Sequence, residues 1–386
     1  MPMANRIIRL WSACSMRDTA YENRETFDRG LEVLWCSDPH VLDQADKQAL
    51  IMPLLSWLDQ HHRSACPAYE RVARLGFGSQ PASRLEDLPY LAVRLFKLLS
   101  LKSVDDSEIF KTLQSSGTTG QSPARVFLDR HTSQLQSKGL VKILQGSIGK
   151  ARLPMLIVDS PAVLKDRKLY TARGAGIQGL SFFGRDHTYA LDEAMQPDWK
   201  AINGFMEQYA GQPVLVFGFT YVVWLHLILA LEAEGRALNL DQGILLHSGG
   251  WKKLEDQKVG HDEFMQRAQQ SLGVQQVTNF YGMAEQVGSV FVECEQGHLH
   301  APVFADIVVR NPYDLTPSAV GEAGLLQVLS VLPFSYPGHS LLTEDRGVFL
   351  GEDDCACGRK GRYFQVLGRM PRAEVRGCSD THQGGL

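Results

Sequence analysis

Short apolar runs alternate with amphipathic stretches from about residue 110 onward. Each run has the length of a strand and carries Gly, Ser or Asp at or next to its end; they are LPMLIVDS (153–160), PVLVFGF (213–219), QGILLHSGG (242–250) and VQQVTNFYG (274–282). The stretches between them, such as 220–235 and 261–272, suit helices. This alternation predicts an α/β domain with a largely parallel sheet flanked by helices.

The two ends of the chain have hydrophobic patterns that differ from that of the middle. Residues 40–75 carry apolar positions at helical spacing, which predicts a helical N-terminal region. After residue 300 the runs ADIVVRN, GLLQVLSV, GVFL and YFQVLGR predict strands. We therefore expect an α/β core over 1–300, a small β-rich subdomain over 301–370 and a short tail over 371–386.

Composition is that of an ordinary globular protein, with 386 residues, 44% hydrophobic and 21% charged. The net charge of −4 predicts no nucleic-acid partner. The apolar stretch 214–231 contains His226 and ends at Glu232, which favours a buried strand–turn–helix over a membrane span. Residues 1–10 lack a long apolar segment, so no signal peptide is expected. Seven cysteines without a secretory signal favour reduced thiols and a cytoplasmic protein.

The segment SSGTTG (115–120) is a candidate phosphate loop. Its hydroxyls and backbone N–H groups can donate to phosphate oxygens, and Gly117 and Gly120 permit close approach. It lacks the spacing of a Walker loop, and Gln121 stands where a lysine would be. By itself such a cluster is also typical of a polar turn.

Three later motifs favour the phosphate-binding interpretation. NFYGMAE (279–285) could stack an adenine and direct Glu285 toward Mg²⁺. TED (343–345) offers Asp345 to ribose hydroxyls, and LGR (367–369) offers Arg369 to ribose and phosphate oxygens. Each motif is weak alone, but their order and spacing together are specific.

In this motif order the chain resembles the adenylate-forming superfamily, and most closely the LuxE family of acyl-protein synthetases. More distantly it is similar to phenylacetate–CoA ligases. The LuxE-like segments span nearly the whole chain: CPAYERV (66–72), LPYLAVRLFK (88–97), KTLQSSGTTGQSPARVFLD (111–129), HSGGWKK (247–253), NFYGMAEQVGSVF (279–291) and VLGRMPRAEVRGCSDT (366–381).

The resemblance implies a role for each motif. ATP-binding residues would be Ser115, Ser116, Gly117, Thr118, Thr119, Gly120, Ser248, Gly249, Gly250, Tyr281, Gly282, Met283 and Asp345. Glu285 would hold Mg²⁺, and Arg369 would neutralise phosphate. The fold implied is that of the superfamily's N-terminal part.

The sequence departs from the superfamily after LGR, where a further domain with a catalytic lysine usually follows. Only residues 370–386 remain, so that domain is expected to be missing, with Arg125 and Lys111 as candidate substitutes for the lysine. Cys378 stands where LuxE-type proteins accept the acyl group as a thioester. Arg372, Arg376 and His382 could lower the pKa of its thiol. The alternative is a surface thiol of no consequence.

Four other side chains form a candidate zinc set. Cys355 and Cys357 make a C-x-C, and Cys294 precedes His298 and His300. Three cysteines and His300 could bind Zn²⁺ tetrahedrally. The spacing is tighter than the usual C-x-x-C, so reduced thiols near a turn remain an alternative.

A fatty acid also needs an apolar pocket. The segments 180–185 and 216–231 are candidate walls through Phe182, Phe183, Phe219 and Trp224, although each could equally be core.

The resemblance implies a ligase that uses ATP and Mg²⁺ to activate a long-chain fatty acid and transfer it to its own Cys378. A LuxC-like acyl reductase subunit would then receive the acyl group. Two alternatives stay open, namely a ligase that releases the acyl group to CoA or a carrier, and a non-catalytic acyl- or nucleotide-binding subunit of a reductase complex.

Overall fold

The computed structural model describes residues 24–114, 123–165, 172–251 and 259–370. Its strands are β1 Leu91–Ala92, β2 Lys111–Gln114, β3 Arg125–Leu128, β4 Leu153–Ile157, β5 Gly184–Tyr189, β6 Val214–Phe219, β7 Gly243–Ser248, β8 Gln276–Tyr281, β9 Phe291–Glu293, β10 Leu299–His300, β11 Ala305–Arg310, β12 Ala323–Ser330, β13 Ser340–Glu352 and β14 Arg362–Arg369. Its main helices are α2 Arg24–Cys36, α3 Gln44–Ala65, α4 Pro67–Phe77, α5 Leu95–Leu98, α6 Arg130–Ile148, α7 Ala162–Lys165, α8 Ala172–Leu180, α9 Trp199–Gln208, α10 Thr220–Val223, α11 Leu229–Ala233 and α12 His261–Leu272.

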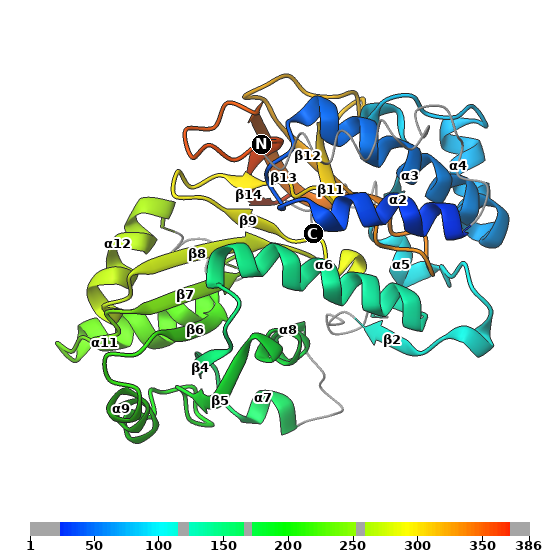
Figure 1. Cartoon of the computed structure of the whole chain (residues 1–386). Helices are drawn as coiled ribbons and strands as arrows, with labels where there is room; N and C mark the ends of the chain where they lie inside the picture. The colour runs from blue at the N-terminus through cyan, green and yellow to red at the C-terminus, as the bar shows by residue number, and fades with distance from the viewer. Residues whose placement is uncertain (1–23, 115–122, 166–171, 252–258, 371–386) are drawn as a thin grey trace, which may run out of the picture.

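One 12-stranded sheet organises the described chain, in the order β11-β12-β13-β14-β10-β9-β8-β7-β6-β4-β5, with β1 added beside β13. Strands β4 to β8 pair in parallel, and the strands from β9 onward pair antiparallel. The predicted α/β alternation and the strand-rich C-terminal part are both confirmed. The sheet runs without a break from the parallel part into the antiparallel part (Figure 1).

Helices cover both faces of the parallel strands because successive strand residues point to opposite faces. Along β6, Leu215 and Phe217 pack in a core with α2, α3, α6 and α8, while Val214 and Val216 pack in a second core with α9 to α12. Figure 1 shows α6 and α8 lying across one face. This two-faced burial explains why the parallel strands read as continuous apolar runs.

The segment after β6 is the predicted buried strand–turn–helix. The chain passes from β6 directly into α10, then into a π-helical turn, Trp224–Ile228, and into α11. Trp224 and Leu231 are buried in the second core. Within the described residues, no helix combines the length and apolar composition needed to cross a membrane.

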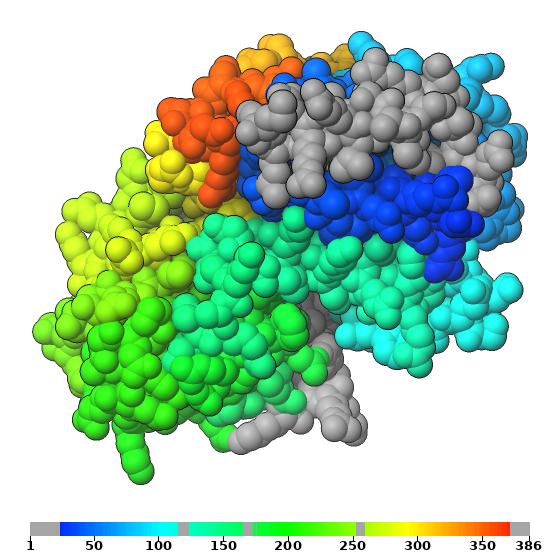
Figure 2. Space-filling model, in the orientation of Figure 1, coloured from blue at the N-terminus to red at the C-terminus, as the bar shows by residue number. Residues whose placement is uncertain are grey.

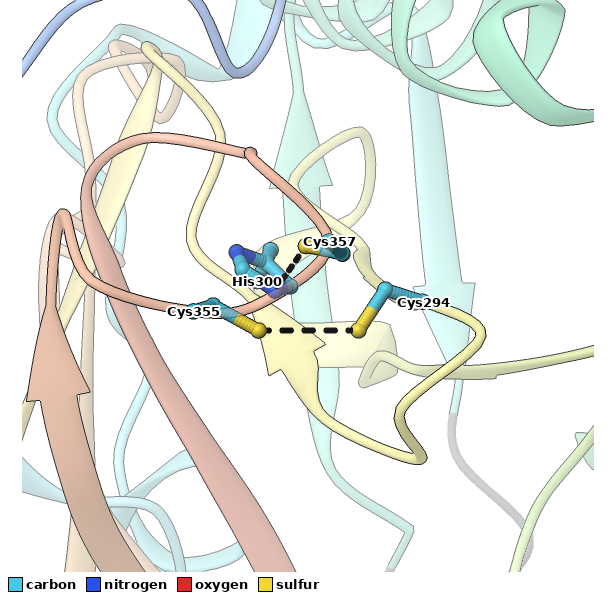
Figure 3. A group of neighbouring side chains, drawn as sticks. All are labelled: Cys294, His300, Cys355 and Cys357. Atoms are coloured by element: carbon cyan, nitrogen blue, oxygen red, sulfur yellow. Dashed lines mark hydrogen bonds between the residues drawn. The ribbon is translucent and has the colours of Figure 1, made fainter.

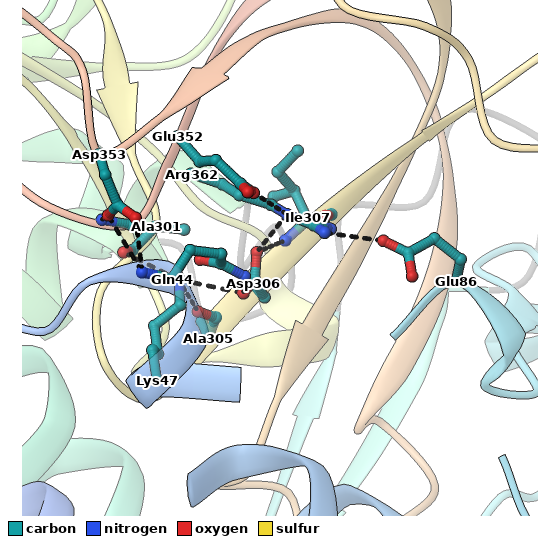
Figure 4. Close-up of polar contacts among 11 residues, drawn as sticks. Gln44, Lys47, Glu86, Ala301, Ala305, Asp306, Ile307, Glu352, Asp353 and Arg362 are labelled. Atoms are coloured by element: carbon teal, nitrogen blue, oxygen red, sulfur yellow. Dashed lines mark hydrogen bonds and ion pairs between the residues drawn. The ribbon is translucent and has the colours of Figure 1, made fainter. Parts of the chain in front are cut away.

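The N-terminal helices pack against the C-terminal strands. Figure 2 shows the blue helices and the orange strands together in one part of the molecule, with the green middle of the chain forming the other. A fully buried ion pair joins Lys47 of α3 to Asp306 of β11, with 3.0 Å between Nζ and Oδ2 (Figure 4). In the same group, Asp353 accepts hydrogen bonds from the backbone N–H groups of Gln44 and Gly361. The start of α3 is thereby attached to the loop between β13 and β14.

Candidate functional site

Three of the predicted nucleotide residues meet where β8 ends beside β13 and β14. The Tyr281 hydroxyl donates a hydrogen bond of 2.7 Å to Oδ2 of Asp345. Asp345 faces Arg369 across the β13–β14 ladder, with 3.8 Å between its Oδ1 and the Arg369 Nε. Arg369 is exposed and Asp345 is partly buried. A partly buried carboxylate and an exposed guanidinium therefore lie side by side, and such a pair could bind the hydroxyl and phosphate oxygens of a ribose phosphate.

Asp345 is held in a defined position. Its backbone N–H donates to Thr343 Oγ1 at 3.1 Å, and that hydroxyl donates to the Leu326 carbonyl at 2.7 Å. Burial raises the pKa of the Asp345 carboxyl, and the hydrogen bond from Tyr281 and the charge of Arg369 oppose the rise. These two neighbours thus stabilise the carboxylate form against the effect of burial.

Glu285 lies just after the Tyr281–Gly282–Met283 turn and is buried. Burial raises the pKa of its carboxyl, while the positive charges of Lys97 and Arg369 act in the opposite direction. Its backbone carbonyl accepts a hydrogen bond of 3.0 Å from the Tyr336 hydroxyl, which in turn accepts from Gln136 Nε2 at 2.9 Å. A carboxylate kept in such a site is well suited to a divalent cation, because the cation would offset the energetic penalty of burial.

The Ser248–Gly249–Gly250 turn follows β7, which neighbours β8. Ser248 Oγ donates 2.8 Å to the Phe280 carbonyl, directly across the β7–β8 pairing. Gly249 has φ of 88°, and a Cβ there would lie 3.1 Å from the Phe219 ring. The turn therefore needs glycine for both its backbone and its close approach to Phe219.

Two predicted parts of the site lie outside the described residues. They are the phosphate loop Ser115–Gly120 and the acceptor candidate Cys378. The strands that flank the loop are described: β2 and β3 pair antiparallel, with Gln114 opposite Arg125. Lys111 and Arg125, the candidate lysine substitutes, are both exposed on this ladder.

The four candidate acyl-pocket residues occupy three different places. Phe182 and Phe183 line an open groove of about 570 Å³ between α6 and the end of α8, together with Leu140 and Val141. Phe219 lies at the end of β6, between Gly249 and Gly176 of α8.

Trp224 packs against Trp251 and Phe264 in the core on the other face of the sheet. The spacing of these residues in the sequence could not show that they lie in different places, because a strand residue and the helix that follows it can face opposite sides of a sheet.

The four candidate zinc ligands are gathered at the β9–β10 turn and the β13–β14 loop (Figure 3). The ligand atoms of Cys294, His300, Cys355 and Cys357 all lie within 4.8 Å of one another. The Cys294 and Cys355 sulfurs are 3.9 Å apart, and Cys357 Sγ is 3.4 Å from His300 Nε2. Zn–S bonds of about 2.3 Å at tetrahedral angles give a sulfur–sulfur edge of about 3.8 Å, so the donors fit that ion.

Neighbouring groups support a metal at these donors. Burial raises the pKa of the Cys294 and Cys357 thiols, and the backbone N–H groups of Gln296 and Arg359, which donate to these sulfurs at 3.4 Å each, oppose that rise. Burial, followed by the charge of Arg359, lowers the pKa of His300 to about 3, so its imidazole is neutral and can ligate.

Two residues near these sites, Tyr336 and Lys97, were given no role by sequence reasoning, and His298 was named only as a neighbour of the candidate zinc ligands. Tyr336 supports Glu285 from an irregular buried segment and carries no motif. His298 Nδ1 lies 3.4 Å from Cys355 Sγ, although its ring stacks on Tyr363. Lys97 acts electrostatically on Glu285 from α5, and its only signal was its place in the LPYLAVRLFK segment.

The chain is similar to several known proteins in sequence and in fold. The chain is 23% identical over 357 residues to a long-chain-fatty-acid--luciferin-component ligase of Vibrio harveyi, covering 90% of this chain and 91% of that protein. Among solved structures, an open conformation of 2-hydroxyisobutyryl-CoA ligase matches with a TM-score of 0.64 at 17% identity, over 86% of this chain and 76% of that one. The postadenylation state of that ligase matches with a TM-score of 0.65 at 17% identity, over 86% and 69%.

The solved structures share the fold of the described residues. The family model for LuxE, described as acyl-protein synthetase, matches residues 26–386. Because that match spans nearly the whole chain, this protein belongs to the LuxE family of acyl-protein synthetases.

Proposed function

We propose that this protein activates a long-chain fatty acid with ATP and carries the acyl group as a thioester on its own Cys378. The observation that carries the proposal is the contact of Tyr281, at the end of β8, with Asp345 of β13, which also pairs with Arg369 of β14, in a chain of the LuxE family. The Vibrio harveyi relative is named as a ligase for a long-chain fatty acid, which supports the choice of substrate.

The first step joins the acid to AMP. A carboxylate oxygen attacks the α-phosphorus of ATP, the bond to the bridging oxygen breaks, and pyrophosphate leaves with the electron pair. Asp345 is placed to accept hydrogen bonds from the ribose hydroxyls, and Arg369 to neutralise phosphate charge. Residues 115–120 are proposed to hold the pyrophosphate. A Mg²⁺ ion, if bound at Glu285, would neutralise phosphate charge.

The second step forms the thioester. The Cys378 thiolate attacks the acyl carbonyl, the carbon–oxygen bond to AMP breaks, and AMP leaves. An acyl reductase is the proposed recipient of the acyl group, in keeping with a family whose members are acyl-protein synthetases.

The five described cysteines carry no disulfide, which supports reduced thiols and a cytoplasmic location.

The acyl chain is proposed to lie along α8. Phe219 lies close to Gly249 and Gly176, which supports its proposed position at the entrance of the acyl site. One turn further along the helix, the groove lined by Phe182 and Phe183 offers about 570 Å³, an ordinary size for a ligand site.

Zinc at Cys294, His300, Cys355 and Cys357 is proposed to be structural, because all four donors come from protein and leave no open position.

Fatty-acid-dependent exchange of radiolabelled pyrophosphate into ATP tests the activation step. We expect exchange with tetradecanoic acid and Mg²⁺, and loss of exchange in Asp345→Ala. Exchange with phenylacetate but with no fatty acid would instead favour an aryl-CoA type of ligase. If no acid supports exchange, the chain is a non-catalytic binding subunit.

A further inference from the structure

The loop between β12 and β13, residues 331–339, is irregular and yet buried along its whole length. Loops usually run over the surface, because a buried backbone must find its hydrogen-bond partners inside the protein. Here Ser335 finds them. Its N–H donates to Thr132 Oγ1 at 3.0 Å, its carbonyl accepts from the Ser103 N–H at 2.8 Å, and its hydroxyl donates to the Phe127 carbonyl at 2.8 Å. The β12–β13 loop is therefore anchored to β3 and to the first turn of α6.

The same loop holds the turn that carries Glu285. The Tyr336 hydroxyl donates to the Glu285 backbone carbonyl at 3.0 Å and accepts from Gln136 Nε2 of α6 at 2.9 Å. The next residue of the turn, Gln286, donates from Nε2 to the Gly338 carbonyl at 2.9 Å. Tyr336 and Gln286 are both almost completely buried. These contacts engage the backbone of Glu285 and the side chain of its neighbour rather than the Glu285 carboxylate.

Close packing on two sides leaves this turn little freedom. A Cβ at Gly338 would clash with the Tyr336 ring and would lie 3.0 Å from the Glu285 carbonyl oxygen. On the other side, Gly288 has φ of 91°, and a Cβ there would lie 2.5 Å from the backbone carbonyl oxygen of Gln136. The turn is thus packed between the β12–β13 loop and α6, with glycine at both contacts.

The β12–β13 loop leads directly into the strand that carries Asp345. β13 begins at Ser340, and the Ser330 N–H at the end of β12 donates to the His339 carbonyl at 2.9 Å, which closes the base of the loop. The loop therefore joins the turn of Glu285 to the strand of Asp345 through buried hydrogen bonds. Two carboxylates that act on one nucleotide must stand at a set separation, because a displacement of about 1 Å can cost about 100-fold in rate.

We propose that the β12–β13 loop is the positioning element of the nucleotide site, with Tyr336 and Gln286 as positioning residues that hold Glu285 in place for a magnesium ion bound to ATP. The inference rests on the proposed adenylation and adds to it the residues that set the geometry of its metal-binding carboxylate. Loosening the contact should weaken metal-dependent binding of ATP. It should spare AMP, whose binding is assigned to Asp345 and Arg369.

The test uses Tyr336→Phe, which removes the hydroxyl and keeps the ring that meets Phe96 edge-on. The matched control is Tyr209→Phe, which removes a hydroxyl that accepts from Gln208 Nε2 at 2.9 Å beside the second core. Calorimetry measures the affinities for MgATP and AMP, pyrophosphate exchange is measured against Mg²⁺ concentration, and thermal denaturation measures stability.

For Tyr336→Phe we expect MgATP to bind about 10-fold more weakly and half-maximal exchange to need about 10-fold more Mg²⁺, the lower end of the range for a residue that supports a metal ligand. AMP affinity should stay within about threefold of the wild type. Excess Mg²⁺ should restore most of the exchange. Tyr209→Phe should alter neither the Mg²⁺ dependence nor the affinities.

A Tyr336→Phe variant that melts at a lower temperature but keeps the wild-type Mg²⁺ dependence and MgATP affinity would overturn the proposal, because the contact would then serve stability alone. Equal losses for MgATP and AMP would overturn it as well. If Tyr336→Phe does not fold by circular dichroism, Gln286→Met, which removes the bond to the Gly338 carbonyl, carries the same comparison. A wild type that shows no exchange with any acid would contradict the proposed function alone, since calorimetry still decides on Tyr336. A wild type that binds neither nucleotide would overturn both.

Discussion

The hydroxyl of Tyr281 and the carboxylate of Asp345 are joined by a hydrogen bond of 2.7 Å. Tyr281 ends β8 and Asp345 lies in β13, and the strands β14, β10 and β9 separate these two in the sheet. Tyr281 contributes to the candidate site from the end of β8, and Asp345 contributes to it from β13. The bond orients the carboxylate that we propose to bind ribose, which lowers the free-energy cost of ordering it when nucleotide binds.

Tyr281→Phe removes this orienting bond and keeps the ring. Because one hydrogen bond to a charged group contributes about 1.5–3 kcal/mol, we expect AMP and ATP to bind about 10-fold more weakly or worse. Isothermal titration calorimetry measures both affinities, with Tyr313→Phe, an exposed tyrosine, as the control. Unchanged affinity in Tyr281→Phe would show that Asp345 does not bind ribose through this arrangement.

Glu285→Gln should raise the stability of the fold and lower the activity. Burial raises the folded pKa of Glu285 above its unfolded value, so ionised Glu285 destabilises the fold as pH rises through the folded pKa. Glutamine removes that charge. We expect the variant to melt at a higher temperature than the wild type at pH 7–8, and at the same temperature below about pH 4, where the glutamate is protonated in both states.

Pyrophosphate exchange in Glu285→Gln should fall by at least about 100-fold, because a metal-binding carboxylate is lost. Glu344→Gln is the control, since Glu344 is exposed and pairs with Arg94 at 3.1 Å. A variant that is less stable than the wild type at pH 8, or one that keeps full exchange, would contradict the role assigned to Glu285.

The four proposed zinc ligands predict a protein that retains one zinc ion per chain on dialysis. Cys355→Ser removes a donor from a closed tetrahedral set, so we expect zinc content to fall and the melting temperature to drop by several degrees. Metal analysis and thermal denaturation measure the two effects. Cys36→Ser, which changes an exposed thiol, should alter neither. A wild type with no zinc and no response to a chelator would refute the site.

The buried ion pair between Lys47 and Asp306 predicts a large loss of stability in Lys47→Met. The variant leaves Asp306 charged and fully buried, which costs about 3–5 kcal/mol. Combining Lys47→Met with Asp306→Asn should recover part of this loss, because it removes a buried charge whose remaining ion-pair partner is Arg362 at 3.9 Å. Chemical denaturation measures these free energies, and Arg84→Met, which breaks an exposed pair with Asp87, should change them by less than about 1 kcal/mol. A loss for Lys47→Met as small as that of Arg84→Met would contradict this view.

Local pattern was enough to predict most elements of this fold. The apolar run 214–219 and the helix after it are determined by neighbouring residues, and the structure places both where the pattern put them. The pairing of Lys47 with Asp306 could not be predicted, because it depends on how α3 docks on β11, far away in the chain. Tyr336 was missed for a related reason: it belongs to a buried irregular segment whose partners come from α6 and from the turn after β8.

The candidate site also contains residues that local sequence could predict and residues that it could not. Asp345 and Arg369 were predicted from short motifs, and strand pairing brings them face to face. Phe182, Phe219 and Trp224 were predicted together, yet they lie in different places because composition does not tell which face of the sheet a side chain takes. Lys97 stood in a quoted segment without a role, since its relation to Glu285 exists only after β1 pairs with β13.

The central claim is that the acyl group is carried on Cys378, and one labelling experiment tests it most directly. The protein is incubated with Mg²⁺, ATP and radiolabelled tetradecanoic acid, and then run on denaturing gels with and without hydroxylamine, beside Cys378→Ala. We predict label on the wild type that hydroxylamine removes, and none on Cys378→Ala. Equal label on both proteins, or exchange activity with no label on the wild type, would contradict acyl transfer to Cys378.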